Sequence, residues 1–290
     1  MKCLFAGCIR NGEKYILKSI ENILEYSKLF DEYNILLVEN GSTDNTKEII
    51  KKISNNKIQI FFKDELNSIK HRTIRLAKCR NFIINKILDE YNHYDFSIFV
   101  DLDNIGNYKI DLKSIESSIK FLKENDNAAA IFANQKGIYY DKWALRHQDI
   151  CPDDFWMEFY KEMGKNSIPG QILDPKIIES IFKKKIFNNH VRFSEEEKYI
   201  SVNSAFGGFG IYKIKPITEN KNKYNGYQNC NFILKDQTQI KKYYSKCEHV
   251  DFNLGLKNLG YDLYIKTNLI NGEIKELYYP IKTVMNMVID

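Results

Sequence analysis

The sequence predicts an α/β protein in which a mostly parallel central sheet is flanked by helices. Two observations support this. Short apolar stretches of strand length alternate along the first half of the chain with longer stretches in which apolar residues recur every three or four positions. The chain has 290 residues, 43% of them hydrophobic, which is enough for one large hydrophobic core. We therefore expect a single domain over residues 1–290.

Five strands are expected in the first half, because each is a short apolar run bounded by turn residues. They cover residues 3–9, 34–39, 58–62, 96–101 and 128–133. Helices with one apolar face are expected between them, over residues 13–29, 46–53, 71–90 and 111–124. A strand–helix–strand order is typical of parallel sheets, since each helix carries the chain back across the sheet.

The second half of the chain has weaker periodicity. Residues 151–199 are polar and contain three prolines, so they are interpreted as helical turns and loops laid over the sheet. Within residues 202–212, glycines among aromatic residues predict a strand that bends or is approached closely by other backbone. Residues 220–245 are polar and rich in lysine, and no element is predicted there. A short helix after Cys247 and a last strand over residues 261–265 complete the expected order.

Charge, apolar stretches and cysteine spacing exclude several classes of protein. The net charge is +5, from 43 basic and 38 acidic residues, which is too small and too dispersed to indicate a nucleic-acid partner. No stretch reaches the ~18 consecutive apolar residues of a transmembrane helix, so none is expected. The six cysteines show no zinc-binding spacing. They predict free thiols in a cytoplasmic protein, with peripheral attachment to a membrane left open.

Two carboxylates follow the apolar run of residues 96–100. Side chains alternate along a strand, so Asp101 and Asp103 point to the same side, at the sheet edge where open α/β proteins bind ligands. Two such carboxylates repel each other unless a cation or a shared proton offsets the repulsion. Mn²⁺ and Mg²⁺ take oxygen ligands and bridge carboxylates to phosphates. On residue chemistry alone, a metal–diphosphate site and a pair of turn-capping residues are equally good interpretations.

The expected helix over residues 71–90 is basic. Arg72 and Arg75 lie three residues apart and therefore share a face of the helix. Such a face is usually only solvated. Because this helix immediately precedes the acidic strand, the alternative is that one of its arginines reaches a phosphate group.

Several motifs, taken in chain order, resemble those of known glycosyltransferases. Residues 40–46, Asn-Gly-Ser-Thr-Asp-Asn-Thr, are similar to the nucleotide-binding start of family 2 glycosyltransferases. The Asp-Leu-Asp of residues 101–103 is similar to the Asp-x-Asp motif of the GT-A glycosyltransferase fold. The stretches that resemble the fungal capsule-associated mannosyltransferase family are residues 75–81, 101–104, 140–146 and 247–249.

The resemblance, which covers about residues 3–265, implies a GT-A fold and a metal-dependent glycosyltransferase. Such an enzyme moves a sugar from a nucleotide-diphosphate sugar, here a UDP or GDP sugar, to a hydroxyl group of a glycan or of a protein-linked acceptor. It implies Mn²⁺ or Mg²⁺ as the cofactor, because a metal stabilises the leaving diphosphate. Residues 1–135 would then form the nucleotide-sugar-binding half and residues 136–290 the acceptor-binding half.

The resemblance also implies roles for individual residues near the donor. The residue expected as the main metal ligand is Asp103, while Asp101 would hold either the metal or the ribose. Strand ends and loops converge on one edge of such a sheet, so several side chains should contact one nucleotide. The expected nucleotide-binding residues are Arg10, Glu39, Asp44, Arg75 and Asp101.

The late stretch Cys247–Asp251 is expected to complete the site. GT-A sites usually take a further metal ligand from late in the chain, and His249 suits Mn²⁺ beside carboxylates and phosphates. Glu248 and Asp251 are then the expected catalytic residues, which hold or activate the acceptor hydroxyl. The alternative is that these two carboxylates only cap the following helix. No acidic pair near residues 180–215 matches the catalytic base of family 2, so the stereochemical outcome stays open.

Two other functions fit parts of the pattern. A haloacid-dehalogenase-like phosphatase also has an apolar strand ending in Asp-x-Asp, and Asp101 would be its nucleophile. That family usually has Thr or Val two residues after the second aspartate, where this chain has Ile105. A non-catalytic nucleotide-sugar-binding protein of the same fold would bind the donor without turnover.

Overall fold

The computed structural model of the chain describes residues 1–169, 171, 173–187 and 190–276. Within these residues the main sheet has eight strands, in the spatial order β3-β2-β1-β4-β7-β5-β10-β6, and β8 and β9 form a separate hairpin. The strands are β1 (Lys2–Ile9), β2 (Glu32–Glu39), β3 (Ile58–Phe62), β4 (Phe96–Val100), β5 (Ala128–Gly137), β6 (Tyr199–Val202), β7 (Phe209–Lys213), β8 (Tyr227–Ile233), β9 (Gln239–Ser245) and β10 (Asp262–Ile274).

The sheet is mostly parallel, which confirms the predicted fold class. Strands β1 to β4 pair in parallel, and β10 pairs in parallel with β5. Strand β7 runs antiparallel between β4 and β5, and β6 runs antiparallel at the edge beside β10. Because β7 is antiparallel to both neighbours, β4 and β5 run in the same direction. The carboxyl ends of β1, β2, β4 and β5 therefore lie on one edge of the sheet.

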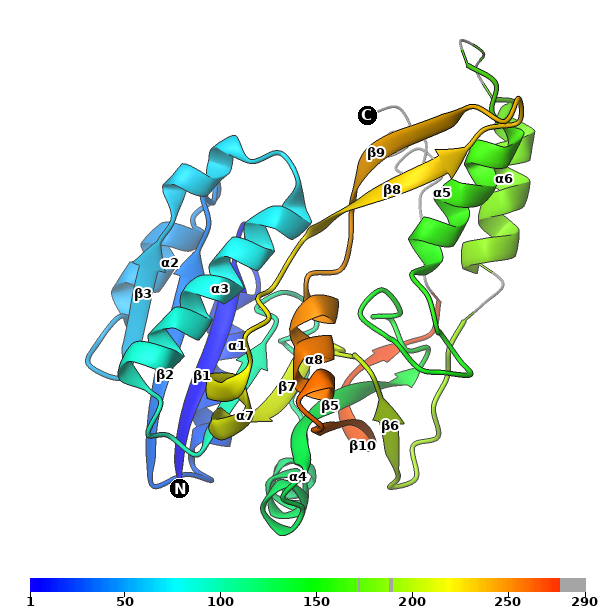
Figure 1. Ribbon diagram of the computed structural model, residues 1–290. Coiled ribbons are helices and arrows are strands. Elements are labelled where there is room, and N and C mark those ends of the chain that lie inside the picture. The colour runs from blue at the N-terminus through cyan, green and yellow to red at the C-terminus, as the bar shows by residue number, and fades with distance from the viewer. Residues whose placement is uncertain (170, 172, 188–189, 277–290) are drawn as a thin grey trace.

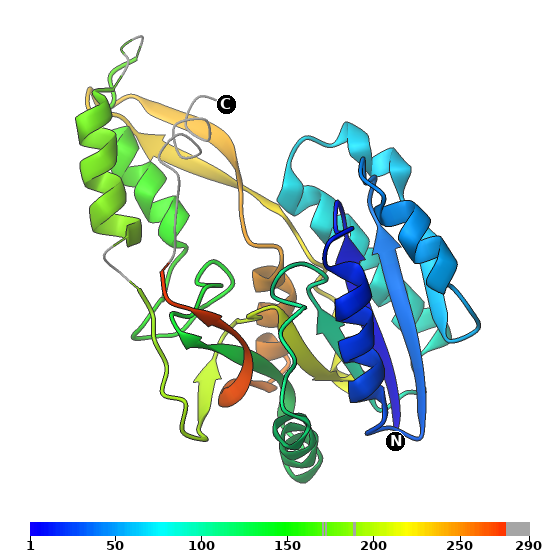
Figure 2. The same cartoon turned by 180° about the vertical axis from the view of Figure 1, so that it is seen from behind.

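Helices cover both faces of the sheet. The helices are α1 (Ile16–Ser27), α2 (Thr46–Ile53), α3 (Arg72–Glu90), α4 (Leu112–Glu124), α5 (Phe155–Asn166), α6 (Pro175–Phe182), α7 (Ile214–Glu219) and α8 (His249–Asn258), with short turns η1 (Asp64–Ser68) and η2 (Lys183–Phe187). Side chains of β1 alternate between two cores: Phe5 packs in the core that contains residues of α1, α2 and α4, and Leu4 in the core that contains residues of α3, α7 and α8. Figure 1 shows the face with α3, α7 and α8, and Figure 2 the opposite face with α1.

Helices α5 and α6 and the β8–β9 hairpin lie together beside the sheet (Figure 1). The sequence analysis predicted helical turns over residues 151–199 but no element over residues 220–245, where the hairpin is found. The hairpin was not expected because one of its faces is exposed and its apolar pattern is weak. A third apolar cluster holds the helices together, and its members are Phe155, Trp156, Phe159, Met163, Ile178, Ile181, Phe182 and Ile186.

The expected bounds differ from the structure at several element ends, and β5, for example, extends to Gly137 instead of ending at residue 133. Helix α1 begins at Ile16, three residues later than expected, and β10 extends to Ile274 instead of ending at residue 265. The extension was not expected because it contains polar residues. Its pairing with β5 shifts register at several points. Among the helices of the described residues, none combines the length and apolar character needed to cross a membrane.

Candidate active site

The Asp-x-Asp pair lies directly after β4, against a tight turn that precedes β7. The backbone N–H of Asp101 donates a hydrogen bond of 2.9 Å to the carbonyl of Gly208. Gly208 has a φ of +80°, and a Cβ atom there would lie 2.8 Å from the Tyr140 hydroxyl oxygen. Only glycine fits this position without strain. Close approach was one of the two roles expected for the glycines of residues 202–212, but Gly207 and Gly208 lie in a turn between β6 and β7 and not within one strand.

Two side chains hold the carboxylate of Asp101. The guanidinium Nη2 of Arg80 lies 3.3 Å from Oδ1, and the hydroxyl group of Tyr140 donates a hydrogen bond of 3.2 Å to Oδ2. Arg80 comes from α3 and Tyr140 from the loop after β5. Both oxygens of Asp101 therefore have a protein partner on the same edge of the sheet.

Arg80 also binds Glu248, which comes from the start of α8. Its Nη1 atom donates a hydrogen bond of 2.6 Å to Glu248 Oε1, and both side chains are about 6% exposed. The Arg80 guanidinium lies 5.2 Å from the ring centroid of Phe206. Burial lowers the pKa of Arg80, but the negative charges of Glu248 and Asp101 outweigh this and raise it. Arg80 is a permanent buried charge that joins Asp101 to Glu248.

Asp103 has fewer protein partners than Asp101. Its Oδ1 accepts a hydrogen bond of 2.9 Å from the backbone N–H of Ile105. Although Asp103 keeps exposed surface, removal of water from its carboxyl group raises its pKa to about 6, and the negative charge of Asp101 adds to the rise. The carboxyl group is mainly ionised at neutral pH. It is therefore the more available of the two aspartates for a cation.

His249 is buried next to this network. It is 3% exposed and stacks on Phe206 with 4.0 Å between ring centroids, and its Nε2 lies 3.9 Å from Glu248 Oε1. Neither ring nitrogen has a hydrogen-bond partner in the part of the chain that the structure describes. Burial lowers the pKa of His249 well below its usual value, and the charges of Arg80 and Arg72 add to this. A neutral imidazole with unpartnered nitrogens has the donor chemistry of a metal ligand.

The fit to a metal ion is incomplete in this arrangement. Over residues 1–169, 171, 173–187 and 190–276, no group of three His, Cys, Asp or Glu side chains is arranged to hold a metal. Asp101 and Asp103 form a carboxylate pair, and His249 belongs to the neighbouring Arg80–Glu248 cluster. A metal at Asp103 would need further ligands from substrate phosphate and water, which is usual for Mg²⁺.

Asp251 lies in the first turn of α8, and its carboxylate already has protein partners. Its Oδ2 accepts hydrogen bonds from Lys246 Nζ at 2.6 Å and from Asn225 Nδ2 at 3.0 Å. These contacts tie α8 to both ends of the β8–β9 hairpin. The structure therefore places Asp251 close in sequence to Glu248 but in a separate ion pair.

The expected nucleotide-binding residues lie around the ends of β1 and β2. Glu39 is fully buried, and its Oε1 accepts a hydrogen bond of 2.5 Å from Ser42 N–H, while Oε2 has no hydrogen-bond partner among the described residues. Asp44 accepts hydrogen bonds from the backbone N–H and the hydroxyl of Thr46, at 3.0 and 2.5 Å, and from Glu13 N–H at 3.2 Å. Asp44 thus shapes the turn before α2 by accepting a hydrogen bond from the backbone two residues further on, as in an Asx turn.

Arg75 lies at the start of α3, close to two other arginines. Its Nη1 donates to the carbonyls of Ile69 and Lys70, at 2.5 and 2.8 Å. Burial lowers its pKa, and the positive charges of Arg10 and Arg72 lower it further. The structure therefore brings Arg10 and Arg75, both predicted nucleotide contacts, into one positively charged group with Arg72.

Comparison with known proteins decides the family. The model of glycosyl transferase family 2 matches residues 8–191, which is more than half of the chain. The chain belongs to glycosyl transferase family 2. Membership identifies it as a glycosyltransferase domain and confirms the resemblance of its opening third. Comparison with curated proteins gave no match.

Comparison with solved structures found similar chains at low sequence identity. The mannosyltransferase PcManGT from Pyrobaculum calidifontis, in complex with GDP-Man and Mn²⁺, has a TM-score of 0.50 and 10% identity over 93% of this chain and 56% of its own. TarS 1–349 of S. aureus has a TM-score of 0.47 and 14% identity over 96% and 59% of the two chains. Glucosyl-3-phosphoglycerate synthase from Mycobacterium tuberculosis has a TM-score of 0.46 and 12% identity over 99% and 77%. This chain thus spans a little under six tenths of PcManGT and TarS 1–349.

The family 2 site contains residues that the sequence analysis did not single out. Asp141 Oδ2 accepts a hydrogen bond of 3.0 Å from Gly207 N–H, and burial raises its pKa to about 7, a rise to which the charge of Asp101 contributes. Gln135 and Asn271 both donate side-chain hydrogen bonds to the Gly207 carbonyl, at 3.0 and 2.5 Å. Nothing local marks these residues, because they come from β5, β10 and a loop and meet only around the glycine turn.

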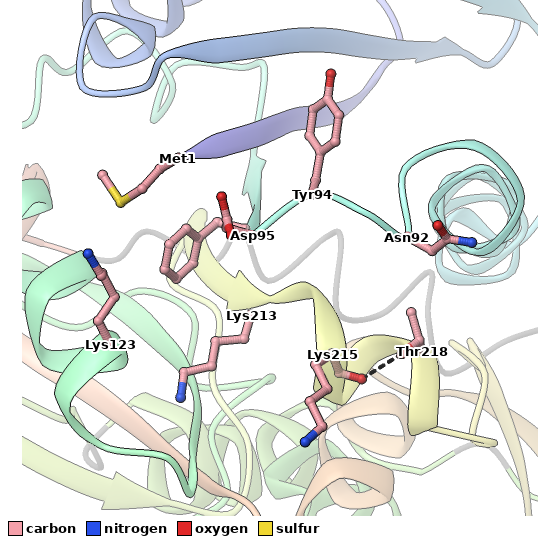
Figure 3. A pocket seen from close by; sticks show the side chains of 9 residues that line it. Met1, Asn92, Tyr94, Asp95, Lys123, Lys213, Lys215 and Thr218 are labelled. Atoms are coloured by element: carbon pink, nitrogen blue, oxygen red, sulfur yellow. Dashed lines mark hydrogen bonds between the residues drawn. The ribbon is translucent and has the colours of Figure 1, made fainter.

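A cavity of about 480 Å³ lies elsewhere in this family 2 glycosyltransferase, around the starts of β1 and β4 (Figure 3). Its lining includes Lys123, Lys213 and Lys215. Lys213 Nζ donates to the carbonyls of Asn125 and Asp126 at 2.8 and 3.2 Å, so its charge is already engaged. No predicted site residue lines this cavity. The candidate site lies at the opposite edge of the sheet, where β4 ends.

Proposed function

We propose that this chain transfers a sugar from a UDP or GDP sugar to a hydroxyl group of a glycan or of a protein-linked acceptor, with Mn²⁺ or Mg²⁺ as the cofactor. The observation that carries the proposal is the buried Arg80, which joins Asp101 of the Asp-x-Asp pair to Glu248. Asp101 lies in the first half of the chain, residues 1–135, and would face the donor. Glu248 lies in the second half, residues 136–290, and would face the acceptor.

The donor would lie along the ends of β1, β2 and β4. Positive charges at Arg10, Arg72 and Arg75 are close enough to disfavour one another, and a diphosphate would relieve that repulsion. Glu39 Oε2, which lies 3.9 Å from Lys47 Nζ but accepts no hydrogen bond among the described residues, can accept one from the nucleoside. Asp44 would act by shaping the turn beside it. These contacts together support a nucleotide diphosphate as the ligand.

Asp103 and Asp101 would hold the metal, and His249 is the further candidate ligand. Asp103 is ionised at neutral pH, whereas His249 is neutral and unpartnered, so both have the protonation state that a metal ligand needs. When bound, Mn²⁺ or Mg²⁺ would neutralise part of the diphosphate charge and stabilise it as the leaving group. PcManGT, which shares the fold, is a complex with GDP-Man and Mn²⁺.

Protein side chains would orient the acceptor and accept its proton. Its hydroxyl oxygen forms a bond to the anomeric carbon, the bond from that carbon to the diphosphate oxygen breaks, and the hydroxyl proton passes to a carboxylate. Glu248 is the proposed proton acceptor, because Arg80 holds it beside Asp101. Asp251, held by Lys246 and Asn225, is the second candidate and would orient the acceptor.

A thermal-shift panel tests the proposal. Purified protein is heated with UDP, GDP, ADP or CMP, each with and without Mn²⁺. A bound nucleotide raises the free energy of unfolding by mass action, by about 2.7 kcal/mol at a hundredfold excess over Kd, and so raises the melting temperature. We expect UDP or GDP to stabilise the protein more with Mn²⁺ than without. Turnover of the matching nucleotide sugar separates an enzyme from a binding protein. Hydrolysis of a generic phosphomonoester, with no nucleotide stabilisation, would instead support the phosphatase alternative.

A further inference from the structure

The β8–β9 hairpin has two faces of different chemistry. One face packs on α5, where the ring centroid of Tyr244 lies 4.5 Å from that of Tyr160. Within the hairpin, the ring centroid of Tyr244 lies 4.8 Å from that of Phe232 on the same face. The alternate residues point the other way and are exposed. We call this second set the outer hairpin face, and it consists of Tyr227, Asn229, Asn231, Ile233, Gln239, Lys241 and Tyr243.

Two tyrosine rings lie together on the outer hairpin face. Tyr243 is 72% exposed and Tyr227 is 48% exposed, and their ring centroids are 6.4 Å apart. Tyr243 pairs with Asn229 across the hairpin, so the two rings are diagonal neighbours on adjacent strands. Single exposed rings are common on protein surfaces, but adjacent ones form a continuous apolar patch that indicates a binding surface.

Apart from Ile233, which is 51% exposed, the rest of the outer hairpin face is polar and nearly uncharged. Asn229, Asn231 and Gln239 supply amide donors and acceptors, Lys241 supplies one positive charge, and no member of the set is acidic. Nucleic-acid binding would need a more basic surface. Rigid aromatic rings beside amides match a neutral ligand that has both apolar C–H faces and many hydroxyl groups. A carbohydrate chain has this combination.

Both ends of the hairpin are anchored at the proposed active site. At one end, the hydroxyl of Thr73 in α3 donates a hydrogen bond of 2.7 Å to the carbonyl of Gly226, the residue before Tyr227. At the other end, Ser245 Oγ lies 3.4 Å from His71 Nδ1, and Glu248 follows three residues later. Tyr243 is five residues from Glu248, so the chain allows at most about 17 Å between them. The hairpin extends from there toward α5 and α6 (Figures 1 and 2).

We propose that the outer hairpin face binds the acceptor as an oligosaccharide, with Tyr227 and Tyr243 packing against its sugar rings. This inference rests on the proposed function, because it takes the acceptor hydroxyl to react near Glu248. The bound chain would run from the outer hairpin face toward Glu248. Because the ligand would cover two tyrosine rings and also present a hydroxyl group near Glu248, we expect it to be a chain of several units.

The test uses the full chain, labelled with a fluorophore, on an array that carries neutral oligosaccharides, monosaccharides and peptides. The variants are Tyr227→Ala and Tyr243→Ala, and the control is Lys242→Ala, which changes an exposed residue of the same hairpin on the other face. We expect the parent and the control to bind a set of oligosaccharides, and each tyrosine variant to lose about tenfold in apparent affinity. Unchanged melting temperatures show that the variants are folded.

Loss of oligosaccharide binding in the tyrosine variants alone supports the inference. Binding to peptides only, equal binding by all variants, or no oligosaccharide binding at all overturns it. UDP and GDP binding with Mn²⁺ is measured on the same samples. If nucleotides do not bind while tyrosine-dependent oligosaccharide binding remains, the proposed function fails and the carbohydrate surface stands. If nucleotides bind normally but the array is blank, the outer hairpin face is not the acceptor site.

Discussion

The hydroxyl group of Tyr140 donates a hydrogen bond of 3.2 Å to Asp101 Oδ2. Tyr140 follows β5 and Asp101 follows β4, so this contact crosses the position of β7 in the sheet. Arg80 binds the other oxygen of the same carboxylate. Asp101 is thereby held in place by the protein on two sides, which leaves Asp103 as the carboxylate with room for a cation.

Replacement of Asp103 should therefore separate metal-dependent chemistry from folding. We expect Asp103→Ala to lower Mn²⁺-dependent sugar transfer by at least about 100-fold, because the leaving diphosphate loses its stabilisation. The melting temperature should stay near that of the parent, since the hydrogen bonds of Asp103 are local ones to the backbone of Ile105 and Gly106. Turnover with and without Mn²⁺ is the measurement. Transfer at the parent rate would show that Asp103 is not a ligand.

Mn²⁺ affinity should depend on pH through the same side chain. The pKa of Asp103 is raised to about 6, so the carboxylate is ionised above this pH and becomes protonated below it. We expect Mn²⁺ affinity to be constant near pH 8 and to fall by up to about tenfold per pH unit below pH 6. Titration of Mn²⁺ into the parent and into Asp103→Asn checks this. A curve that keeps the same inflection in the variant would assign the titration to another group.

The buried ion pair of Arg80 and Glu248 makes a prediction about stability. We expect Arg80→Met to lower the free energy of unfolding by about 3–5 kcal/mol, because a buried carboxylate is left without its partner. The double variant Arg80→Met with Glu248→Met should recover much of that loss while remaining inactive. Urea unfolding of the parent, both single variants and the double variant measures the coupling. Additive effects of the two changes would show that the pair does not act as a unit.

The buried carboxyl group of Asp141 should make the folded protein less stable as the pH rises to about 7. Burial raises its pKa to about 7, so the folded protein holds a proton that the unfolded chain has already released. Stability from this group is complete below the unfolded pKa, near 4, and is lost as the pH rises to about 7. We expect Asp141→Asn to gain on the order of 1–2 kcal/mol over the parent at pH 8 and little at pH 4. Thermal unfolding at both pH values is the measurement, and an equal effect at both would contradict the assignment.

Replacement of His249 tests whether a residue from the late part of the chain binds the metal. If it is a ligand, His249→Ala should weaken Mn²⁺ binding by about 10- to 100-fold and lower turnover. The control is Phe206→Leu, which removes the ring stacked on His249 but leaves the imidazole. Parent-like Mn²⁺ dependence and turnover in His249→Ala would show that the residue is structural.

Much of the fold follows from local patterns in the sequence. The apolar runs at β1 to β5 identify the parallel strands, because a strand buried on both faces needs apolar residues at nearly every position. The Asp-x-Asp pair could be placed for the same reason, since the end of β4 is visible in the chain. The hairpin over residues 227–245 could not, because a two-stranded unit with one exposed face has only a weak apolar pattern.

The sequence by itself determined the parallel sheet and the acidic strand end, because each depends on residues that are neighbours in the chain. Only the tertiary structure decided which residues share the site. Arg80 and Glu248 are 168 residues apart, and neither carries a local sign that it will be buried against the other. Burial of two opposite charges is tolerable only when they meet at hydrogen-bonding distance. That meeting depends on how α3 and α8 pack on one face of the sheet, which no local pattern encodes.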